Sequence, residues 1–133
     1  MALVSTENLP IRQEIDVVAV RRHVRELATK LGFSLVDQTK LVTAASELAR
    51  NTMIYGGGGF MLAETLNGPR SGLRLTFEDK GPGIPNIELA LRDGFTTGSG
   101  LGLGLGGAKR LVSEFEVVSR VGEGTKVTIT RWK

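Results

Sequence analysis

The chain has 133 residues, of which 41% are hydrophobic, and this is enough for one domain with a buried core, spanning residues 1–133. It contains no cysteine and a single histidine, so disulfides and cysteine-based metal sites are excluded and a zinc site is not expected. The net charge is +3, and no run of Lys or Arg is long enough to predict a nucleic-acid partner. No stretch approaches the roughly 18 apolar residues of a membrane span, and the N-terminus lacks the features of a signal peptide, so we expect a cytoplasmic protein with no membrane partner.

The first half of the chain predicts an edge strand followed by two helices. Residues 8–13 form the strand, which Pro10 confines to an edge. The first helix runs from Glu14 to Gly32, and its apolar face is expected to contain Ile15, Val18, Val24, Leu27, Ala28 and Leu31. His23 lies on this helix among arginines and is expected to be exposed. The second helix begins near Ser34, in a pattern that resembles a capping box, and ends at glycines 56–59; its apolar positions are Leu41, Ala44, Ala45, Leu48, Thr52 and Tyr55.

The second half predicts two hairpins separated by a glycine-rich loop. The β-like runs 60–66 and 73–78 are joined by a turn-rich segment, which indicates an antiparallel hairpin. A short helix is expected over 86–92, a long loop over 94–107 and another helix over 108–114. The last hairpin is expected to pair strands 115–121 and 125–132. Helices mixed with antiparallel strands predict the α+β class, with one sheet and helices on one face.

Glu47 and Asn51 form the first group of residues that points to chemistry. They are four residues apart on a predicted helix, so their side chains lie on one face, one turn apart. The Asn51 oxygen is a hard ligand suited to Mg²⁺, and Glu47 can orient or deprotonate a nucleophile. The alternative interpretation is a surface pair on an amphipathic helix.

Asp79 is the centre of the second group, because it ends an apolar strand at the edge of the predicted sheet. There it can accept a hydrogen bond from an adenine amino group. Gly81 and Gly83 follow it and would let a base approach the backbone closely. An ordinary turn after a strand is the alternative.

The third group is the glycine-rich segment 98–107, which precedes Lys109 and Arg110. Glycines allow successive backbone N–H groups to point at one anion, and a helix N-terminus adds its positive dipole. The alternation of Gly and Leu favours a mobile flap whose leucines find apolar cover over a plain flexible loop. A P-loop is excluded because the chain lacks its motif, and the Gly-x-Gly-x-x-Gly match at 102–107 follows no strand.

These three groups, in this order, resemble the N, G1 and G2 boxes of the GHKL superfamily of ATP-binding proteins, and the likeness covers residues 8–132. The segments 47–51, 81–85, 93–97 and 122–125 are similar to those of one branch, the RsbT-like switch serine/threonine kinases of bacterial stress-response modules. The resemblance implies a two-layer α+β sandwich with a mixed, mostly antiparallel sheet. It also implies ATP and Mg²⁺ as ligands.

The resemblance assigns roles to residues at the matching positions. Glu47 would be the catalytic base, Asn51 would hold Mg²⁺ and Asp79 would recognise adenine. Thr125, at the start of the last strand, would also contact the adenine pocket, and Lys109 is a candidate phosphate contact. The remaining nucleotide-binding positions are Gly81 and Gly83 and, in the ATP lid, Gly100, Leu101, Gly102, Leu103, Gly104, Leu105 and Gly106.

Kinases of this branch phosphorylate a serine or threonine on STAS-domain antagonist or scaffold proteins, and when released they activate a PP2C-type phosphatase. We therefore expect the same activity and partners here. One alternative is an anti-sigma factor that binds a sigma subunit in an ATP-dependent manner. Another is a nucleotide-binding switch without transfer activity, against which the presence of Glu47 and Asn51 argues.

Overall fold

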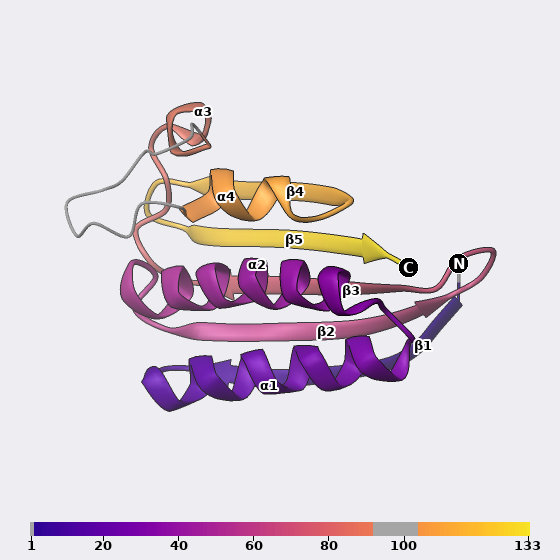
Figure 1. The fold of residues 1–133 in the computed structure, drawn as a ribbon. Helices are drawn as coiled ribbons and strands as arrows, with labels where there is room; N and C mark the ends of the chain where they lie inside the picture. Colours follow the sequence, from indigo (N-terminus) through magenta and orange to yellow (C-terminus); the bar gives the residue numbers. More distant parts are fainter. Residues whose placement is uncertain (1, 92–103) are drawn as a thin grey trace.

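The computed structural model describes residues 2–91 and 104–133 of the chain, which form one sheet with helices packed on one face (Figure 1). Over these residues the sheet has five strands in the order β1-β2-β3-β5-β4, and each neighbouring pair is antiparallel. The strands are β1 (Ala2–Ile11), β2 (Gly59–Asn67), β3 (Gly72–Asp79), β4 (Glu114–Arg120) and β5 (Gly124–Trp132). The predicted α+β two-layer fold and both predicted hairpins are confirmed.

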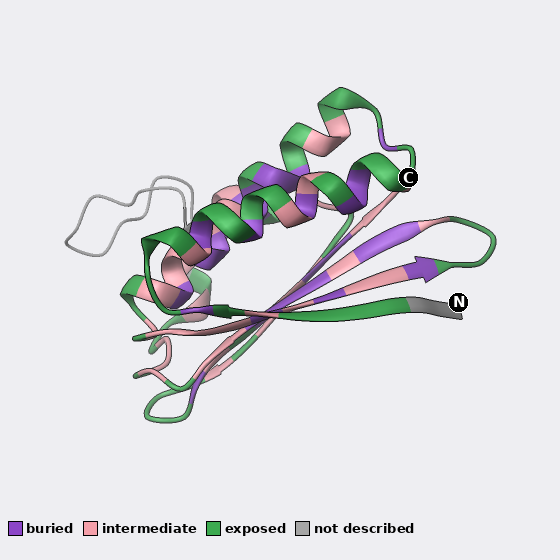
Figure 2. Cartoon of the chain, turned by 90° about the horizontal axis from the view of Figure 1, so that it is seen from below, coloured by how far each residue is buried: buried purple, intermediate pink, exposed green. Residues whose placement is uncertain are grey.

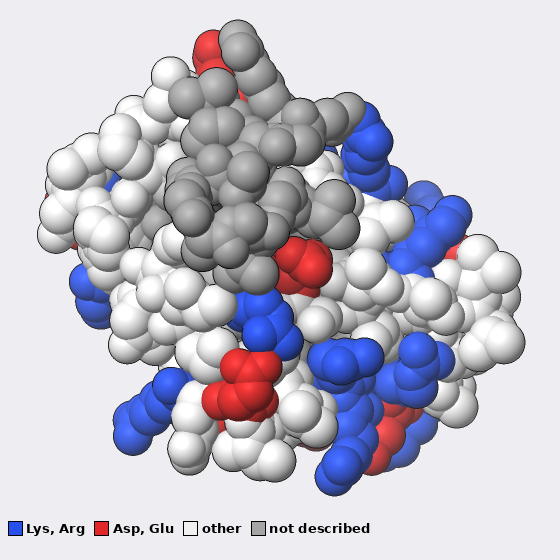
Figure 3. All heavy atoms as spheres, turned by 60° about the vertical axis from the view of Figure 1, so that its left-hand side comes forward, with Lys and Arg blue, Asp and Glu red and all other residues white. Residues whose placement is uncertain are grey.

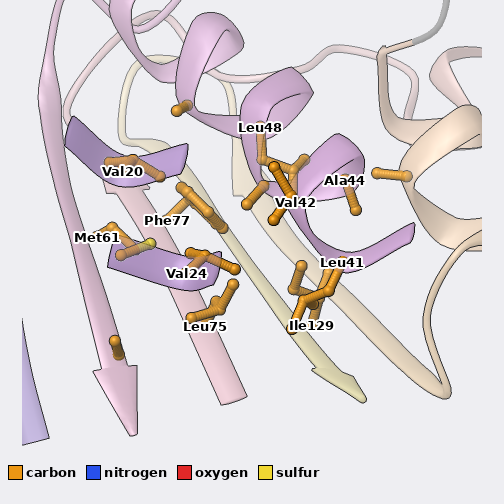
Figure 4. Close-up of a cluster of buried hydrophobic side chains, with 14 of the residues drawn as sticks. Val20, Val24, Leu41, Val42, Ala44, Leu48, Met61, Leu75, Phe77 and Ile129 are labelled. Atoms are coloured by element: carbon orange, nitrogen blue, oxygen red, sulfur yellow. The ribbon is translucent and has the colours of Figure 1, made fainter. Parts of the chain in front are cut away.

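Helices α1 (Glu14–Lys30), α2 (Leu35–Ile54) and α4 (Gly104–Arg110) lie side by side across the same face, and the short α3 (Ile87–Ala90) lies next to α4. Figure 2 shows the sheet and these helices as two layers, with the buried residues turned toward the space between them. The core fills this space (Figure 4): Val20 and Val24 of α1 and Leu41 and Leu48 of α2 face Met61, Leu75, Phe77 and Ile129 of the sheet.

The ends of α1 and α2 follow local capping rules. The Asp16 carboxylate accepts from the backbone N–H groups of Arg12 and Gln13 at 2.9 and 3.1 Å, which caps the start of α1. Gly32 takes a φ of +83° just after its end, as predicted for a helix stop. Ser34 caps α2 by accepting from the N–H of Asp37 at 3.1 Å, so the predicted start of this helix is confirmed.

The predicted apolar face of α1 is wrong at its N-terminal end. Ile15 and Val18 are 63% and 42% exposed, whereas the buried positions are Val17, Val20, Val24, Leu27 and Ala28. At about 100° per residue, Ile15 lies on the side of the helix opposite Val24. The two residues therefore cannot share one face, and Val17 and Val20 occupy the inward positions instead.

His23 also differs from its prediction, because it is half-buried and its Nε2 contacts the Glu7 carboxylate of β1. The strand that carries Glu7 is longer than predicted: β1 begins at Ala2 and pairs with β2 along its length. It lies at the edge of the sheet, as the proline at position 10 predicted.

The helix after the glycine-rich segment is displaced by four residues from its prediction. The sequence predicts a loop to residue 107 and a helix over 108–114, but α4 begins at Gly104 and ends at Arg110. Leu105 and Ala108 are buried, and α4 packs against α2. This tertiary packing outweighs the low helix propensity of the three glycines in α4.

Candidate functional site

A cavity of about 470 Å³ opens at the end of the sheet where β3 ends and β5 begins. Its walls come from α2, β3, the segment between β3 and α3, α3 itself, α4 and β5. Most of the lining is apolar and includes Leu48, Phe77, Ile84, Ala90, Leu105 and Val127. The polar lining residues are Asn51, Thr52, Tyr55, Asp79, Asn86 and Thr125. An apolar slot with a few converging polar groups is the usual form of a small-molecule site.

The C-terminal half of α2 supplies one wall. Asn51 lines the cavity, and its backbone carbonyl oxygen accepts from the backbone N–H groups of Tyr55 and Gly56 at 2.9 and 3.1 Å. This bonding fixes the end of the helix just where it meets the cavity. Glu47 lies one turn earlier on the same face of α2 and is half-buried. The predicted helical pair is therefore present, with Asn51 in the cavity wall and Glu47 one turn away.

Asp79 is the last residue of β3, and its carboxylate stands at the edge of the apolar slot. The N–H of Gly81 donates to its Oδ1 at 2.8 Å. Burial raises the pKa of Asp79 above its ordinary value; the backbone N–H groups of Gly81 and Thr125 oppose this rise, and the neighbouring charge of Glu78 adds to it. The group is thus a partly buried carboxylate whose orientation a backbone N–H helps to fix, which suits the recognition of a donor on a ligand.

Glycines surround Asp79 because its side chain and the neighbouring backbone leave no room for a Cβ. A Cβ at Gly56 would lie 2.4 Å from Asp79 Cγ, and one at Gly81 would lie 2.7 Å from the Gly56 Cα. A Cβ at Gly124 would lie 2.1 Å from the Asp79 carbonyl oxygen. Gly83 lines the cavity with a φ of +79°, whereas Gly81 is not among the lining residues. The packing of the protein itself therefore requires these glycines.

Thr125 lies opposite Asp79 in the β3–β5 register and opposite Ser119 in the β4–β5 register. Its Oγ1 is 2.8 Å from Ser119 Oγ. The sequence predicts Thr125 as a cavity residue, and the structure places it in the lining. Ser119 was not predicted as a site residue. It faces Thr125 within the last hairpin, and the pairing of β5 with the distant β3 brings that hairpin to Asp79.

Part of the predicted lid lies within α4. Gly104 begins that helix, Leu105 lines the cavity, and both Leu105 and Gly106 are buried. Gly100, Leu101, Gly102 and Leu103 lie outside the described residues. Lys109, the candidate phosphate contact, is exposed on α4.

Other lining residues, among them Thr52, Tyr55, Ile84 and Asn86, were not predicted as site residues. Tyr55 is four residues after Asn51, and the helical period alone could have placed it on the same face. Thr52 is four residues after Leu48, and the same period places it beside that lining residue. Ile84 and Asn86 follow the Gly-Pro-Gly turn, and no periodic signal marks their direction.

Charge around the cavity is mixed: Figure 3 shows Lys and Arg interspersed with Asp and Glu on this end of the molecule. Among the described residues, no group of three or more His, Asp or Glu side chains is placed to hold a metal ion. None of the described helices is long and apolar enough to cross a membrane.

Comparison with known families gives a match over residues 36–133 to "Histidine kinase-, DNA gyrase B-, and HSP90-like ATPase". The chain is 46% identical to the serine/threonine-protein kinase RsbT of Bacillus subtilis over 123 residues, which are 92% of each chain. It is 32% identical to the anti-sigma F factor of a Thermoanaerobacter species over 117 residues, covering 84% of this chain and 82% of that protein.

Solved structures share the fold at lower identity. The RsbU and RsbW domains of a Mycobacterium tuberculosis protein superpose with a TM-score of 0.65 at 22% identity, over 97% of this chain and 33% of that one. The mycobacterial sensor histidine kinase MprB gives a TM-score of 0.57 at 20% identity, over 96% of this chain and 97% of that one. These likenesses concern the fold alone.

Proposed function

Because this chain belongs to the histidine kinase-, DNA gyrase B- and HSP90-like ATPase family and is a serine/threonine-protein kinase of the partner-switching type, we propose that it phosphorylates a STAS-domain antagonist or scaffold protein with ATP bound in the cavity described above. The observation that carries this proposal is the oriented carboxylate of Asp79 at the edge of an apolar slot. A purine ring fits between apolar walls, and its amino group is a donor that a carboxylate recognises.

Catalysis rests on alignment and charge neutralisation, because phosphoryl transfer requires little covalent participation by the protein. Asp79 and the apolar walls fix the base, which sets where the phosphates lie. Glu47 takes the proton of the acceptor hydroxyl, as its carboxylate lies half-buried one turn from Asn51. The backbone N–H groups of the glycine-rich lid are expected to hold the phosphates.

The residues fit a Mg²⁺ ion bound together with ATP. Asn51 lines the cavity and its carboxamide carries an oxygen of the kind that Mg²⁺ accepts, and the described residues offer no all-protein acidic cage. This agrees with the usual Mg²⁺ site, in which substrate phosphates and water supply most ligands. When bound, the ion neutralises charge on the phosphate oxygens.

Transfer of labelled γ-phosphate from Mg-ATP to STAS-domain proteins of the same genome tests the proposal. We expect label on a serine or threonine with the wild type, and its loss with Glu47→Ala and Asp79→Asn. Glu26→Ala is the matched control, because Glu26 is an exposed glutamate on α1. If the protein binds ATP and labels no STAS-domain protein, the proposed substrate class is wrong.

We further propose that the kinase, when released from its STAS-domain partner, activates a PP2C-type phosphatase. The activity of a candidate phosphatase should rise on addition of the free chain and fall again when the STAS-domain protein is present in excess. Phosphatase activity that does not respond to the chain would contradict this part.

The second candidate function is an anti-sigma factor, which the 32% identity to anti-sigma F factors favours. It predicts a stable complex with a sigma subunit in the presence of ATP. Co-purification with a sigma subunit, and not with STAS-domain proteins, would select this function over the first.

A further inference from the structure

Ser119 has an arrangement of hydrogen bonds that bears on which nucleotide the cavity accepts. It lies near the end of β4, on the side of the sheet that faces the helices, since burial alternates along this strand. Its Oγ accepts from the backbone N–H of Ile84 at 2.8 Å and donates to the carbonyl oxygen of Gly124 at 3.0 Å. The third contact, at 2.8 Å, is with Thr125 Oγ1.

A serine hydroxyl has one hydrogen and two lone pairs, so its three contacts can be assigned. The Gly124 carbonyl can only accept, and it therefore takes the Ser119 hydrogen. The Ile84 N–H can only donate, and it takes one lone pair of Ser119. All three contacts are satisfied together only if the Thr125 hydroxyl donates its hydrogen to the second lone pair. The hydroxyl hydrogen of Thr125 then points toward Ser119 and away from the cavity.

This assignment leaves Thr125 Oγ1 as an acceptor on the cavity wall, beside the carboxylate of Asp79, its partner in the β3–β5 register. Two acceptors at one edge match an exocyclic amino group, which carries two hydrogens. They repel a carbonyl oxygen at the same position, because it has no hydrogen to donate. Adenine has the amino group at this point of its ring, and guanine has the carbonyl.

We propose that Ser119 is a positioning residue for purine selectivity: it holds the hydroxyl of Thr125 in the acceptor state and thereby favours a 6-amino purine over a 6-oxo purine. This proposal rests on the proposed binding of ATP. Ser119 does not line the main cavity and acts through Thr125.

The bond from Ile84 gives Ser119 a second effect on the same site. The segment between β3 and α3 carries Gly83 and Ile84 in the cavity wall, and the turn after β4 holds it through the N–H of Gly122, which donates to the Pro82 carbonyl at 2.7 Å. Loss of the serine hydroxyl removes one of these two attachments. We expect the loss of this attachment to weaken the binding of every nucleotide to a similar extent. The ratio of ATP affinity to GTP affinity therefore reports only the effect through Thr125.

The experiment measures the affinities of the full chain for Mg-ATP and Mg-GTP by competition with a fluorescent ATP analogue. In Ser119→Ala the Thr125 hydroxyl loses its acceptor and turns its hydrogen toward the cavity. We expect the preference for ATP over GTP to fall by about tenfold. GTP does not become the better ligand, because Asp79 still opposes its carbonyl. Ser119→Thr keeps the hydroxyl and should restore most of the preference.

Thr125→Val and the double variant test whether Ser119 acts through Thr125. If it does, the selectivity of the double variant equals that of Thr125→Val. Ser113→Ala is the matched control. Ser113 lies at the other end of the same hairpin, and its Oγ accepts from the backbone N–H of Trp132 at 3.1 Å. That control also loses a serine hydroxyl that bonds to the backbone, but it should keep the wild-type preference.

The outcomes distinguish this proposal from the one on which it rests. A wild type that binds neither nucleotide means that the proposed ATP site is wrong. A wild type that prefers ATP, with a folded Ser119→Ala variant that keeps the same preference, overturns the role of Ser119 alone. If Ser119→Ala does not fold, the ratio measured with Thr125→Val and Ser119→Thr decides: an unchanged ratio in Thr125→Val overturns the proposal.

Discussion

At the scale of single residues, burial of the Asp79 carboxyl group disfavours its charge but makes it a stronger hydrogen-bond acceptor for a ligand. Burial opposes its charge, and two backbone N–H groups compensate for only part of that cost. The same partial burial strengthens a hydrogen bond from a ligand, because the local dielectric is lower than in bulk water. A site that recognises a neutral amino group therefore benefits from the environment that destabilises its own charge.

The raised pKa of Asp79 predicts opposite pH dependences for stability and binding. Between the ordinary value of 3.8 and the raised pKa, the folded chain binds more protons than the unfolded chain. The contribution of Asp79 to stability is thus present below this window and is lost as the pH rises through it. ATP affinity should rise over the same window as the acceptor ionises. Both trends should be absent in Asp79→Asn, as urea unfolding and nucleotide titration at each pH would measure; a variant that keeps both trends contradicts the assignment.

The contact between Gly56 and Asp79 predicts that the smallest added side chain damages the site. In Gly56→Ala, the new Cβ would lie 2.4 Å from Asp79 Cγ, so the carboxylate must move out of its position. We expect ATP affinity to fall at least about tenfold, equivalent to about 1.4 kcal/mol, in an equilibrium-binding measurement. Gly57→Asn is the control, because a Cβ at Gly57 meets no atom within 4 Å and asparagine tolerates its φ of +73°. Equal losses in the two variants would show that general strain, and not displacement of Asp79, is responsible.

At the scale of elements, α2 connects the two ends of the molecule. Its C-terminal half carries Asn51 to the cavity wall and Glu47 one turn earlier, and its first turn is tied to β5 at the opposite end. There the Arg131 guanidinium donates to Asp37 Oδ1 at 2.6 Å and to the Leu111 carbonyl oxygen at 3.0 Å. One side chain thus joins α2, the segment after α4 and the last strand.

Removal of this guanidinium should destabilise the fold without touching the cavity. Arg131→Met keeps most of the side-chain volume but leaves a half-buried carboxylate and a carbonyl without their partner. We expect a loss of about 2 kcal/mol in the free energy of unfolding, measured by urea denaturation. Arg22→Met, on the exposed face of α1, should change it by less than about 0.5 kcal/mol. A similar small change in both variants would mean that the contacts of Arg131 contribute little.

The elements that could be predicted from the sequence are those with local signals. Local hydrogen bonds decide where helices and strands begin and end, and Ser34, Gly32 and the turn glycines mark these positions. Both hairpins follow from the β-like runs of residues and the turns between them. The start of α4 could not be predicted, because the burial of Leu105 against α2 is a tertiary effect. The candidate site divides in the same way: Asp79 and Asn51 were found from motif and period, whereas Ser119 depends on cross-strand register.

At the scale of the whole molecule, the cavity belongs to no single element. Its walls come from α2, β3, α3 and the segment before it, α4 and β5. These lie next to one another only when the sheet and the helix layer are packed together. Phe77 shows this coupling, because it is buried in the core and also lines the cavity. A ligand in this position binds the folded chain and has no comparable site on the unfolded one.

Ligand binding should therefore stabilise the entire fold, by an amount that grows with the logarithm of the ligand concentration above its Kd. At a Mg-ATP concentration of 100 times its Kd, the free energy of unfolding should rise by about 2.7 kcal/mol, because the ligand binds only the folded state. Urea denaturation at increasing Mg-ATP measures this as a rising midpoint with a constant slope. Asp79→Asn should need a higher ATP concentration for the same rise, since the cavity has lost its charged acceptor. If the wild-type midpoint does not move at concentrations that saturate binding, the nucleotide occupies a surface that survives unfolding, and the cavity is not its site.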